Sequence, residues 1–411
     1  MSKTDVIIIG AGQAGLAVSH CLTCLGIDHL VLERGQVAER WRNERWDTLR
    51  LLTPNWMNRM PGHSYNGADP DGFMTAAEYA AFLQNYADSG AVPVRAQTEV
   101  QSVQRLGGGH RVATRNGIWH ARGVVIATGH CDEPFVPAMA QRLPAAIQQV
   151  TTSTYRRAAD LPQGGVLIIG ASASGIQLAE EIHLTGRPVT IAVSRHTRLP
   201  RRYRGRDIMW WLDRYNILDA EPMTPEELDA ARAQPSMQLV GRPDHSDLDL
   251  GVLQRLGIRL VGRVGDIDGA RLSLHDNLAD AVAGSHARME RLLRRVDVVA
   301  GATGAPEETM PAPFAVGASP STLDLTAEGI RTVVWATGFV RNYRWLQVPV
   351  LTPSGDIIHA GGVTPSPGLF VTGLRFLRRR DASFIGALTQ DATELSAEIH
   401  RYLNKTTSIA A

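Results

Sequence analysis

Cysteine and lysine are both scarce in this sequence. Three cysteines among 411 residues are too few for a disulfide framework. Lysine occurs only at Lys3 and Lys405, so arginine carries nearly all of the positive charge. No apolar run approaches the roughly 18 residues that a helix needs to cross a bilayer. The sequence therefore predicts neither a disulfide scaffold nor a transmembrane protein.

Net charge is also nearly absent, because 42 Lys and Arg side chains offset 41 Asp and Glu side chains to leave +1. Such a chain has no general field that attracts nucleic acid or an anionic membrane. Hydrophobic residues make up 44% and charged residues 20%, which is typical of a globular protein, and the length allows two or three domains. The first predicted strand begins at residue 5 or 6 and leaves no room for a secretory signal, so we expect a cytosolic protein.

A strand, a glycine turn and a helix are predicted at the start of the chain. The β-branched run 6–9 is typical of a strand that is buried on both faces of a parallel sheet. Gly10, Gly12 and Gly15 follow at G-x-G-x-x-G spacing. In this motif the first glycine permits the turn, the second lets backbone N–H groups approach a pyrophosphate, and the third lets the helix pack on the strand.

An acidic residue supports this interpretation. The second predicted strand, 29–32, ends in Glu33, whose carboxylate can accept hydrogen bonds from adenosine ribose hydroxyls. The unit as a whole predicts a dinucleotide site, and its residues alone leave NAD and FAD equally open.

A second unit of the same kind follows in the middle of the chain. The run 166–169 is a buried strand, and the turn after it carries Gly170, Ser172 and Gly175. Ser172 stands where the second glycine would be, so the backbone approaches phosphate less closely but gains a hydroxyl donor. The next predicted strand is followed by Arg195, at the position where the first unit has the acidic residue Glu33. A guanidinium can hold a 2′-phosphate that a carboxylate would repel, which favours NADPH over NADH.

Two strands with nearly the same ending predict the domain order. The stretches 123–129 and 333–339 both contain Ala-Thr-Gly after an apolar run, which indicates two passes of the chain between the same pair of domains. We therefore expect a first FAD-binding part at 1–159, an inserted NADPH-binding domain at 160–315, and the return of the FAD-binding domain at 316–411.

The segments between these units are less regular. The stretch 41–61 is rich in Trp and Arg and suits a wall over a cofactor or substrate. A helix is predicted at about 75–87, followed by a small antiparallel sheet beside the first domain, and a closing helix is predicted at 387–403. The stretch 201–256 gives little signal, and the identity of the substrate is expected to depend on it and on 41–61.

Two motifs carry a weaker chemical signal. Cys21 and Cys24 have C-x-x-C spacing, but both fall on the first predicted helix, far from any redox ring, which favours small buried helix residues over a dithiol. Glu180 and His183 have ligand-like spacing on one helix, but no second such pair exists, which favours a surface pair. We therefore predict no metal site.

Two glycine turns, the first followed by Glu33 and the second by Arg195, resemble the flavin-containing monooxygenase family. The resemblance is strongest to bacterial single-chain members described as flavoproteins involved in potassium transport, and it covers nearly the whole chain, including 364–374. It implies an α/β fold of two nested Rossmann-like domains, with parallel doubly wound sheets and a small antiparallel sheet. It also implies FAD at the first turn and NADPH at the second.

The resemblance also implies individual site residues. An asparagine beside the flavin ring corresponds to Asn55, which is the candidate catalytic residue. The implied cofactor-binding residues are Gly10, Gly12, Gln13, Gly15, Glu33, Arg34, Trp41, Thr128, Gly129, Gly170, Ser172, Ser174, Gly175, Arg195, Thr337 and Gly338.

The implied chemistry is aerobic. NADPH reduces FAD, O₂ adds at the flavin C4a position, and the resulting hydroperoxide transfers one oxygen atom to a nitrogen or sulfur of a small organic substrate. The chain departs from the family fingerprint before the second turn, because Ile147 and Thr151 replace the expected Gly and His, whereas Tyr155 matches. This departure bears on oxygenation more than on cofactor binding.

Several other functions stay open at this point. A Baeyer–Villiger monooxygenase or an NADPH oxidase would use the same cofactors, and a non-catalytic redox-sensing subunit would share both glycine turns. A disulfide reductase would need a dithiol against the flavin, where Cys21 and Cys24 are badly placed. We expect a small-molecule substrate and O₂ as partners, with no nucleic acid and no membrane, and a homodimer stays open.

Overall fold

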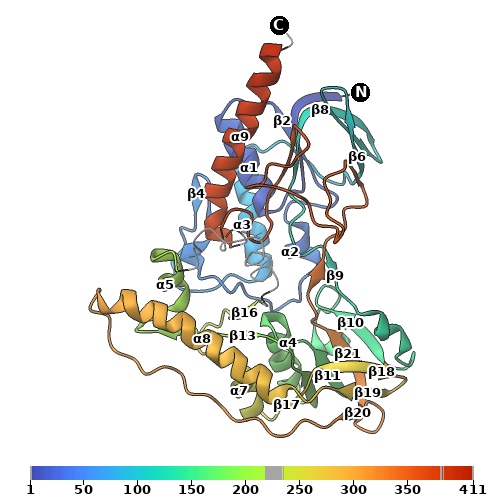
Figure 1. Ribbon diagram of the computed structural model, residues 1–411, viewed down its shortest axis with the longest axis vertical. Coiled ribbons are helices and arrows are strands. Elements are labelled where there is room, and N and C mark those ends of the chain that lie inside the picture. Colours follow the sequence, from blue (N-terminus) through green and yellow to red (C-terminus); the bar gives the residue numbers. More distant parts are fainter. Residues whose placement is uncertain (1, 218–233, 235, 380–381, 383, 410–411) are drawn as a thin grey trace. The chain divides into compact units, whose positions relative to one another are not determined.

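The computed structural model describes the chain apart from residues 1, 218–233, 235, 380–381, 383 and 410–411. The chain divides into two compact units (Figure 1). The first unit comprises 1–43, 53–133 and 339–411, and the second comprises 44–52 and 134–338.

One mixed sheet organises the first unit, in the order β23-β6-β7-β8-β1-β2-β5, with β24 also paired to β8. β1 is parallel to both β2 and β8, whereas β7 is antiparallel to both β6 and β8. The strands are β1 Ser2–Ile9, β2 His29–Leu32, β5 Val94–Arg95, β6 Val100–Leu106, β7 Gly109–Thr114, β8 Gly117–Ile126, β23 Leu346–Gln347 and β24 Leu369–Val371.

The predicted antiparallel strands beside the first domain are present as β6, β7 and β8, but they do not form a sheet of their own. β8 is long enough to pair with β7 over 117–121 and with β1 as far as Ile126. The antiparallel strands therefore extend the main sheet. The mixed α/β fold with parallel sheets is confirmed.

Helices and short elements complete the first unit. A capping box between Thr75 and Glu78 starts α3, because the Thr75 side chain accepts from the Glu78 N–H and the Glu78 carboxylate accepts from the Thr75 N–H. The elements are α1 Gln13–Cys24, α2 Glu39–Asn43, η1 Asn55–Met57, β3 Arg59–Met60, β4 His63–Ser64, α3 Ala76–Ser89, η4 Ile385–Ala387 and α9 Leu388–Ile409.

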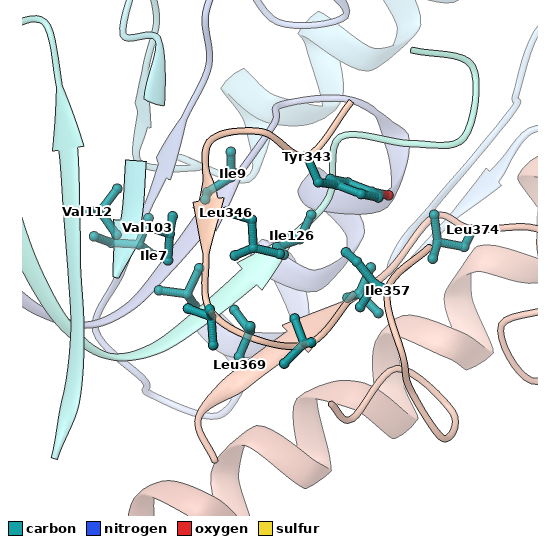
Figure 2. Packing of buried hydrophobic residues seen from close by; sticks show 14 of the residues in the cluster. Ile7, Ile9, Val103, Val112, Ile126, Tyr343, Leu346, Ile357, Leu369 and Leu374 are labelled. Atoms are coloured by element: carbon teal, nitrogen blue, oxygen red, sulfur yellow. The ribbon is translucent and has the colours of Figure 1, made fainter. Parts of the chain in front are cut away.

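The returning C-terminal part of the chain builds much of the core of the first unit. Figure 2 shows Ile7 and Ile126 from the parallel strands beside Leu346, Ile357 and Leu369 from the return. All five are at most 6% exposed. Burial of these side chains holds the sheet and the return together.

A parallel sheet in the order β10-β21-β11-β12-β17 organises the second unit. An antiparallel sheet, β18-β19-β20, packs in the same core as β11 and β21. The elements are β10 Gln148–Thr151, β11 Gly165–Ile169, α4 Ala173–His183, β12 Val189–Ala192, β13 Thr197–Arg198, β14 Arg202–Tyr203, β15 Arg206–Asp207, α5 Ile208–Arg214, β16 Met237–Gln238, α7 Leu250–Arg255, β17 Arg259–Val261, β18 Val264–Asp268, β19 Arg271–Leu274, α8 Leu278–Gly301, β20 Thr322–Asp324 and β21 Ile330–Trp335. The remaining short elements of the chain are β9 Glu133–Pro134, η2 Ala138–Arg142, η3 Ala158–Asp160 and β22 Phe339–Val340.

The second unit is longer than the expected inserted domain of 160–315. β21 pairs with β10 on one side and with β11 on the other, so both β10 and β21 belong to this sheet. In the part of the chain that the structure describes, no helix is both long and apolar enough to span a membrane.

Candidate functional site

The first glycine turn connects β1 to α1 and is closely packed on two sides. Gly10 has φ +108°, and a Cβ there would lie 2.7 Å from the Ala127 carbonyl oxygen. A Cβ on Gly15 would overlap the Gly10 carbonyl oxygen. Gly12 differs, because a Cβ there would meet no atom within 4 Å. The turn therefore leaves open space at the N-cap of α1, where backbone N–H groups and the helix dipole favour an anion. These residues fit a pyrophosphate.

Glu33 fastens this turn to the end of β2. It is 7% exposed, and its Oε2 accepts from the Ala11 N–H at 2.7 Å while its Oε1 accepts from the Gly35 N–H at 2.9 Å. A carboxylate offers about four acceptor positions, so two remain for ribose hydroxyls. Glu33 thus orders the turn itself, and its contact with a ribose stays a prediction.

The loop after β2 brings two further predicted residues to the turn. The Ala38 N–H donates to the Ala11 carbonyl at 3.0 Å. The Tyr79 hydroxyl donates to Gln13 Oε1 at 3.1 Å, and its ring lies edge-on to Trp41 with centroids 5.0 Å apart. Gln13 and Trp41 are therefore linked through a tyrosine of α3. Arg34 is exposed beside Glu33.

Two more strand ends reach this turn. The Ala127 N–H donates to the Ile9 carbonyl, which places Thr128 and Gly129 directly after β8 and next to the turn. Gly373 follows β24, and a Cβ there would lie 2.9 Å from Ala14 Cβ. Sequence reasoning missed the role of Gly373, although the Thr-Gly pair after an apolar strand was a signal for it.

Asn55 has a local structural role. It is 5% exposed, its Nδ2 donates to the Asp69 carbonyl at 2.9 Å, and its Oδ1 accepts from the Met74 N–H at 2.9 Å. Its amide therefore holds the loop from η1 to Met74 together. A catalytic contact from Asn55 stays a prediction.

An ion pair that sequence reasoning missed lies close to β8. Arg40 pairs with the Asp132 carboxylate and also donates to the Asp132 carbonyl at 2.8 Å. The side chains are 20% and 14% exposed. The pair ties α2 to the segment that follows Gly129.

The second glycine turn, between β11 and α4, repeats the geometry of the first. Gly170 has φ +114°, and a Cβ there would overlap the Ala336 carbonyl oxygen. A Cβ on Gly175 would overlap the Gly170 carbonyl oxygen. Ala336 follows β21 as Ala127 follows β8, so the two Ala-Thr-Gly stretches serve equivalent positions in the two units.

The hydroxyl groups near the second turn differ in whether they form hydrogen bonds within the protein. Ser172 is the N-cap of α4, but its hydroxyl makes no capping hydrogen bond, which leaves the hydroxyl for another acceptor. Ser174 is half-buried in the first turn of α4. The Thr337 hydroxyl donates to the Phe135 carbonyl, and Gly338 after it has φ +91°. Ser172 and Ser174 thus lie at the N-terminus of α4, and Thr337 and Gly338 follow Ala336, which packs on Gly170.

Gln238 is a second residue that sequence reasoning missed. It is 1% exposed, and its Nε2 donates to the Ala171 carbonyl in the turn. It belongs to β16, which pairs with β13. No local pattern marks this glutamine, because its partner lies 67 residues earlier.

Arg195 lies at the edge of the sheet where the turn begins. β11 and β12 are parallel with Ile169 opposite Ala192, so residues just after these strands share one edge. Arg195 is exposed there, whereas the next residue, His196, is buried. Burial lowers the pKa of His196, and its Nδ1 lies 2.9 Å from the Ser194 carbonyl oxygen.

The altered fingerprint follows β10. The Thr151 hydroxyl accepts from the Ser153 N–H at 3.3 Å and so stabilises a local turn. The Tyr155 hydroxyl donates to Glu181 Oε1 at 2.7 Å, and burial followed by this hydrogen bond raises the pKa of Tyr155. Glu181 also accepts from the Thr48 hydroxyl, which holds the segment 44–52 on the second unit.

The two weaker motifs carry no site. Cys21 is half-buried against Thr393 of α9 and Cys24 is exposed, so the expectation that both are buried is wrong, because Leu22 takes the buried face of the last turn of α1. Both thiols are free, at the end of α1 opposite the glycine turn. Glu180 pairs with Arg242 at 3.0 Å. Within the described residues, no group of three or more His, Cys, Asp or Glu could hold a metal ion.

Comparison with known proteins identifies relatives over the whole chain. The family described as pyridine nucleotide-disulphide oxidoreductase matches residues 7–217. An uncharacterized oxidoreductase, CzcO-like, from Geobacillus kaustophilus is 30% identical over 398 residues, which cover 96% of this chain and 98% of that protein.

Solved structures show the same fold at lower identity. A flavin-containing monooxygenase from Stenotrophomonas maltophilia has a TM-score of 0.68 at 19% identity, covering 98% of this chain and 100% of that chain. The bacillithiol disulfide reductase Bdr from Bacillus cereus has a TM-score of 0.61 at 18% identity, covering 97% and 99%. The fold is therefore common to enzymes of different activity and does not by itself select one.

Proposed function

Because the chain belongs to the pyridine nucleotide-disulphide oxidoreductase family, we propose that it is a flavin-containing monooxygenase that binds FAD at the first glycine turn and NADPH at the second. The chain is an oxidoreductase. The proposed reaction inserts one atom of O₂ into a small organic substrate at nitrogen or sulfur, through a C4a-hydroperoxyflavin. NADPH supplies two electrons, and the second oxygen atom leaves as water.

The observation that carries the proposal is a difference between two otherwise equivalent turns. Gly10 and Gly170 have nearly the same conformation and press against equivalent carbonyl groups, of Ala127 and Ala336. The strand that follows each turn and helix, however, is followed by Glu33 in the case of β2 and by Arg195 in the case of β12. A carboxylate accepts hydrogen bonds from an unmodified ribose, whereas a guanidinium attracts a 2′-phosphate.

The residues of the chain have defined tasks in this proposal. The N-termini of α1 and α4 bind the two pyrophosphates, and the open space at Gly12 allows the flavin nucleotide to approach closely. FAD, when bound, supplies the electron transfer and the activation of O₂, and the protein supplies orientation and the exclusion of water. No Ser/His/Asp triad is needed.

The position of the cysteines argues against the disulfide reductase alternative. Cys21 and Cys24 lie at the C-terminal end of α1, and the glycine turn is at its N-terminal end. A dithiol there is separated from the turn by the length of a 12-residue helix, which is about 18 Å. Cys131 lies after Gly129 but has no second thiol next to it in the sequence.

Isotope labelling tests the proposed reaction. The purified yellow protein is supplied with NADPH and ¹⁸O₂, together with an aryl methyl thioether, a tertiary amine or a cyclic ketone, and products are analysed by mass spectrometry. We expect one ¹⁸O atom in the sulfoxide or N-oxide for each NADPH consumed. Label in a lactone would indicate a Baeyer–Villiger enzyme, and peroxide alone would indicate an NADPH oxidase.

Two further outcomes contradict the proposal more broadly. A protein that binds both nucleotides without turning NADPH over would be a redox-sensing subunit. Activity on a disulfide that is lost in Cys24→Ser would establish the reductase. The cytosolic location and the oligomeric state stay predictions.

A further inference from the structure

Helix α8 is anchored directly beside the predicted 2′-phosphate position in the second unit. The Ser285 hydroxyl accepts from the Arg198 N–H at 2.7 Å, and the Arg288 guanidinium donates to the His196 carbonyl. His196 is the residue after Arg195, so the helix is fixed one residue from the arginine that the sequence assigns to NADPH. Figure 1 shows α8 passing close to β13, which begins at Thr197.

Three guanidinium groups gather at this point. Arg195 is exposed after β12, Arg288 is half-buried, and Arg291 is exposed one helical turn further along α8. The charges of Arg195 and Arg291, after burial, lower the pKa of Arg288, so the groups interact electrostatically. The Arg288 Nε is buried without a hydrogen-bond partner among the described residues.

Nearby acidic side chains contact other side chains. Glu290 lies 3.6 Å from His286, and Asp297 pairs with Arg204 at 2.6 Å. Asp249 pairs with Arg198 of β13 at 2.5 Å. In the part of the chain that the structure describes, neither Arg288 nor Arg291 forms an ion pair with a carboxylate.

Arg288 and Arg291 bring like charges together, and among the described residues neither pairs with a carboxylate, which raises the energy of the protein unless an anion binds. We infer that Arg288 and Arg291 of α8 join Arg195 in holding the 2′-phosphate, and thereby set the preference for NADPH over NADH. A phosphate monoester carries a charge of about −1.5 to −2 at neutral pH and offers three acceptor oxygens, which suits several guanidinium groups. The inference rests on the proposed use of NADPH at the second turn.

An amphipathic helix usually carries its arginines on a solvated face, and Arg294 fits that description. It is exposed on α8, and it is not among the groups that shift the pKa of Arg288. Arg288 differs because its guanidinium is tied to the backbone beside Arg195. Arg294 therefore provides a matched control of the same residue type on the same helix.

The experiment compares binding of 2′,5′-ADP and 5′-AMP to the FAD-loaded protein by calorimetry. These probes differ in the 2′-phosphate and in no other group of the ribose or base. Loss of a charge-assisted hydrogen bond weakens binding by about tenfold or more, so we expect Arg288→Gln and Arg291→Gln each to raise the Kd for 2′,5′-ADP by about that factor. Binding of 5′-AMP should be unchanged, and Arg294→Gln should alter neither.

The outcomes separate this inference from the proposed function. Wild-type protein that binds both probes equally would overturn the NADPH assignment and this inference with it. Wild-type preference for 2′,5′-ADP that survives in both variants would overturn the role of α8 alone. If Arg288→Gln weakens the binding of both probes equally, Arg288 has a structural effect. Arg291→Gln is then the test, because Arg291 is exposed. An unchanged preference for 2′,5′-ADP over 5′-AMP in Arg291→Gln would contradict the inference.

Discussion

Gly12 allows the protein fold and the flavin site to be tested separately. An alanine Cβ at Gly12 would meet no atom within 4 Å, and the residue has φ −82° and ψ −180°, which alanine adopts readily. Gly12→Ala should therefore leave the apoprotein as stable as before, or more stable by about 0.4 to 1 kcal/mol, because the unfolded chain loses freedom. The same Cβ occupies the space through which a pyrophosphate would approach the N-terminus of α1.

The expected loss is in FAD affinity. Displacing the pyrophosphate costs at least one charge-assisted hydrogen bond, which is about 2 kcal/mol or roughly thirtyfold in Kd. Gly15→Ala is the contrasting variant, because its Cβ would overlap the Gly10 carbonyl oxygen and force α1 away from β1. We expect Gly15→Ala to destabilise the apoprotein by about 1 to 3 kcal/mol, as overpacking does.

Two measurements on each variant test whether the pyrophosphate of FAD lies at this turn. Urea unfolding of the apoprotein gives the stability, and quenching of FAD fluorescence during titration gives the Kd. Gly12→Ala should change the Kd without lowering the stability, and Gly15→Ala should lower the stability. Wild-type FAD affinity in Gly12→Ala would refute the placement of the pyrophosphate at this turn.

Three further predictions follow from single side chains. Arg195→Ala should raise the KM for NADPH by about tenfold or more and leave that for NADH nearly unchanged, in steady-state kinetics, and equal effects would contradict the 2′-phosphate assignment. Burial, followed by the charge of Arg105, lowers the pKa of His110 to about 4. The unfolded state then binds the extra proton first, so stability should fall by up to about 3 kcal/mol from pH 6.5 to pH 4, as seen in urea midpoints, and His110→Gln should flatten that dependence. Tyr155→Phe should cost about 1 to 3 kcal/mol in urea unfolding, because Glu181 loses a donor, and no loss would show that water replaces the hydroxyl.

Both glycine turns were predictable because their signals are local. The spacing of Gly10, Gly12 and Gly15, after a β-branched strand, specifies strand, turn and helix within a few residues. Gly170 and Gly175 repeat the pattern, and in the structure the two Ala-Thr-Gly stretches follow β8 and β21, the strands that pair with β1 and β11.

Contacts between distant residues were not predictable in the same way. Gln238 reaches the second turn from 67 residues away, and nothing in its neighbourhood marks it. The stretch 41–61 reads as one aromatic wall, but 44–52 belongs to the second unit. Asp47 connects this segment to the second unit, because its carboxylate pairs with Arg156 at 3.3 Å and its N–H donates to the Arg156 carbonyl at 3.0 Å.

Asn55 has a structural role that its motif did not reveal. Its place after a Leu-Leu-Thr-Pro stretch suggested a residue beside the flavin, and its amide also bonds to Asp69 and Met74 within its own loop. These partners lie 14 and 19 residues later in the chain, so no local pattern indicates them.

The most direct test of the account is a double-mixing stopped-flow measurement. The yellow protein is first reduced anaerobically with NADPH or NADH at equal concentration, and the reduced protein is then mixed with O₂. The account predicts faster bleaching of the flavin band by NADPH, followed on aeration by a transient flavin–oxygen adduct that precedes the return of oxidised flavin. Equal reduction by both nucleotides, with reoxidation in a single step and release of one peroxide per NADPH, would contradict it.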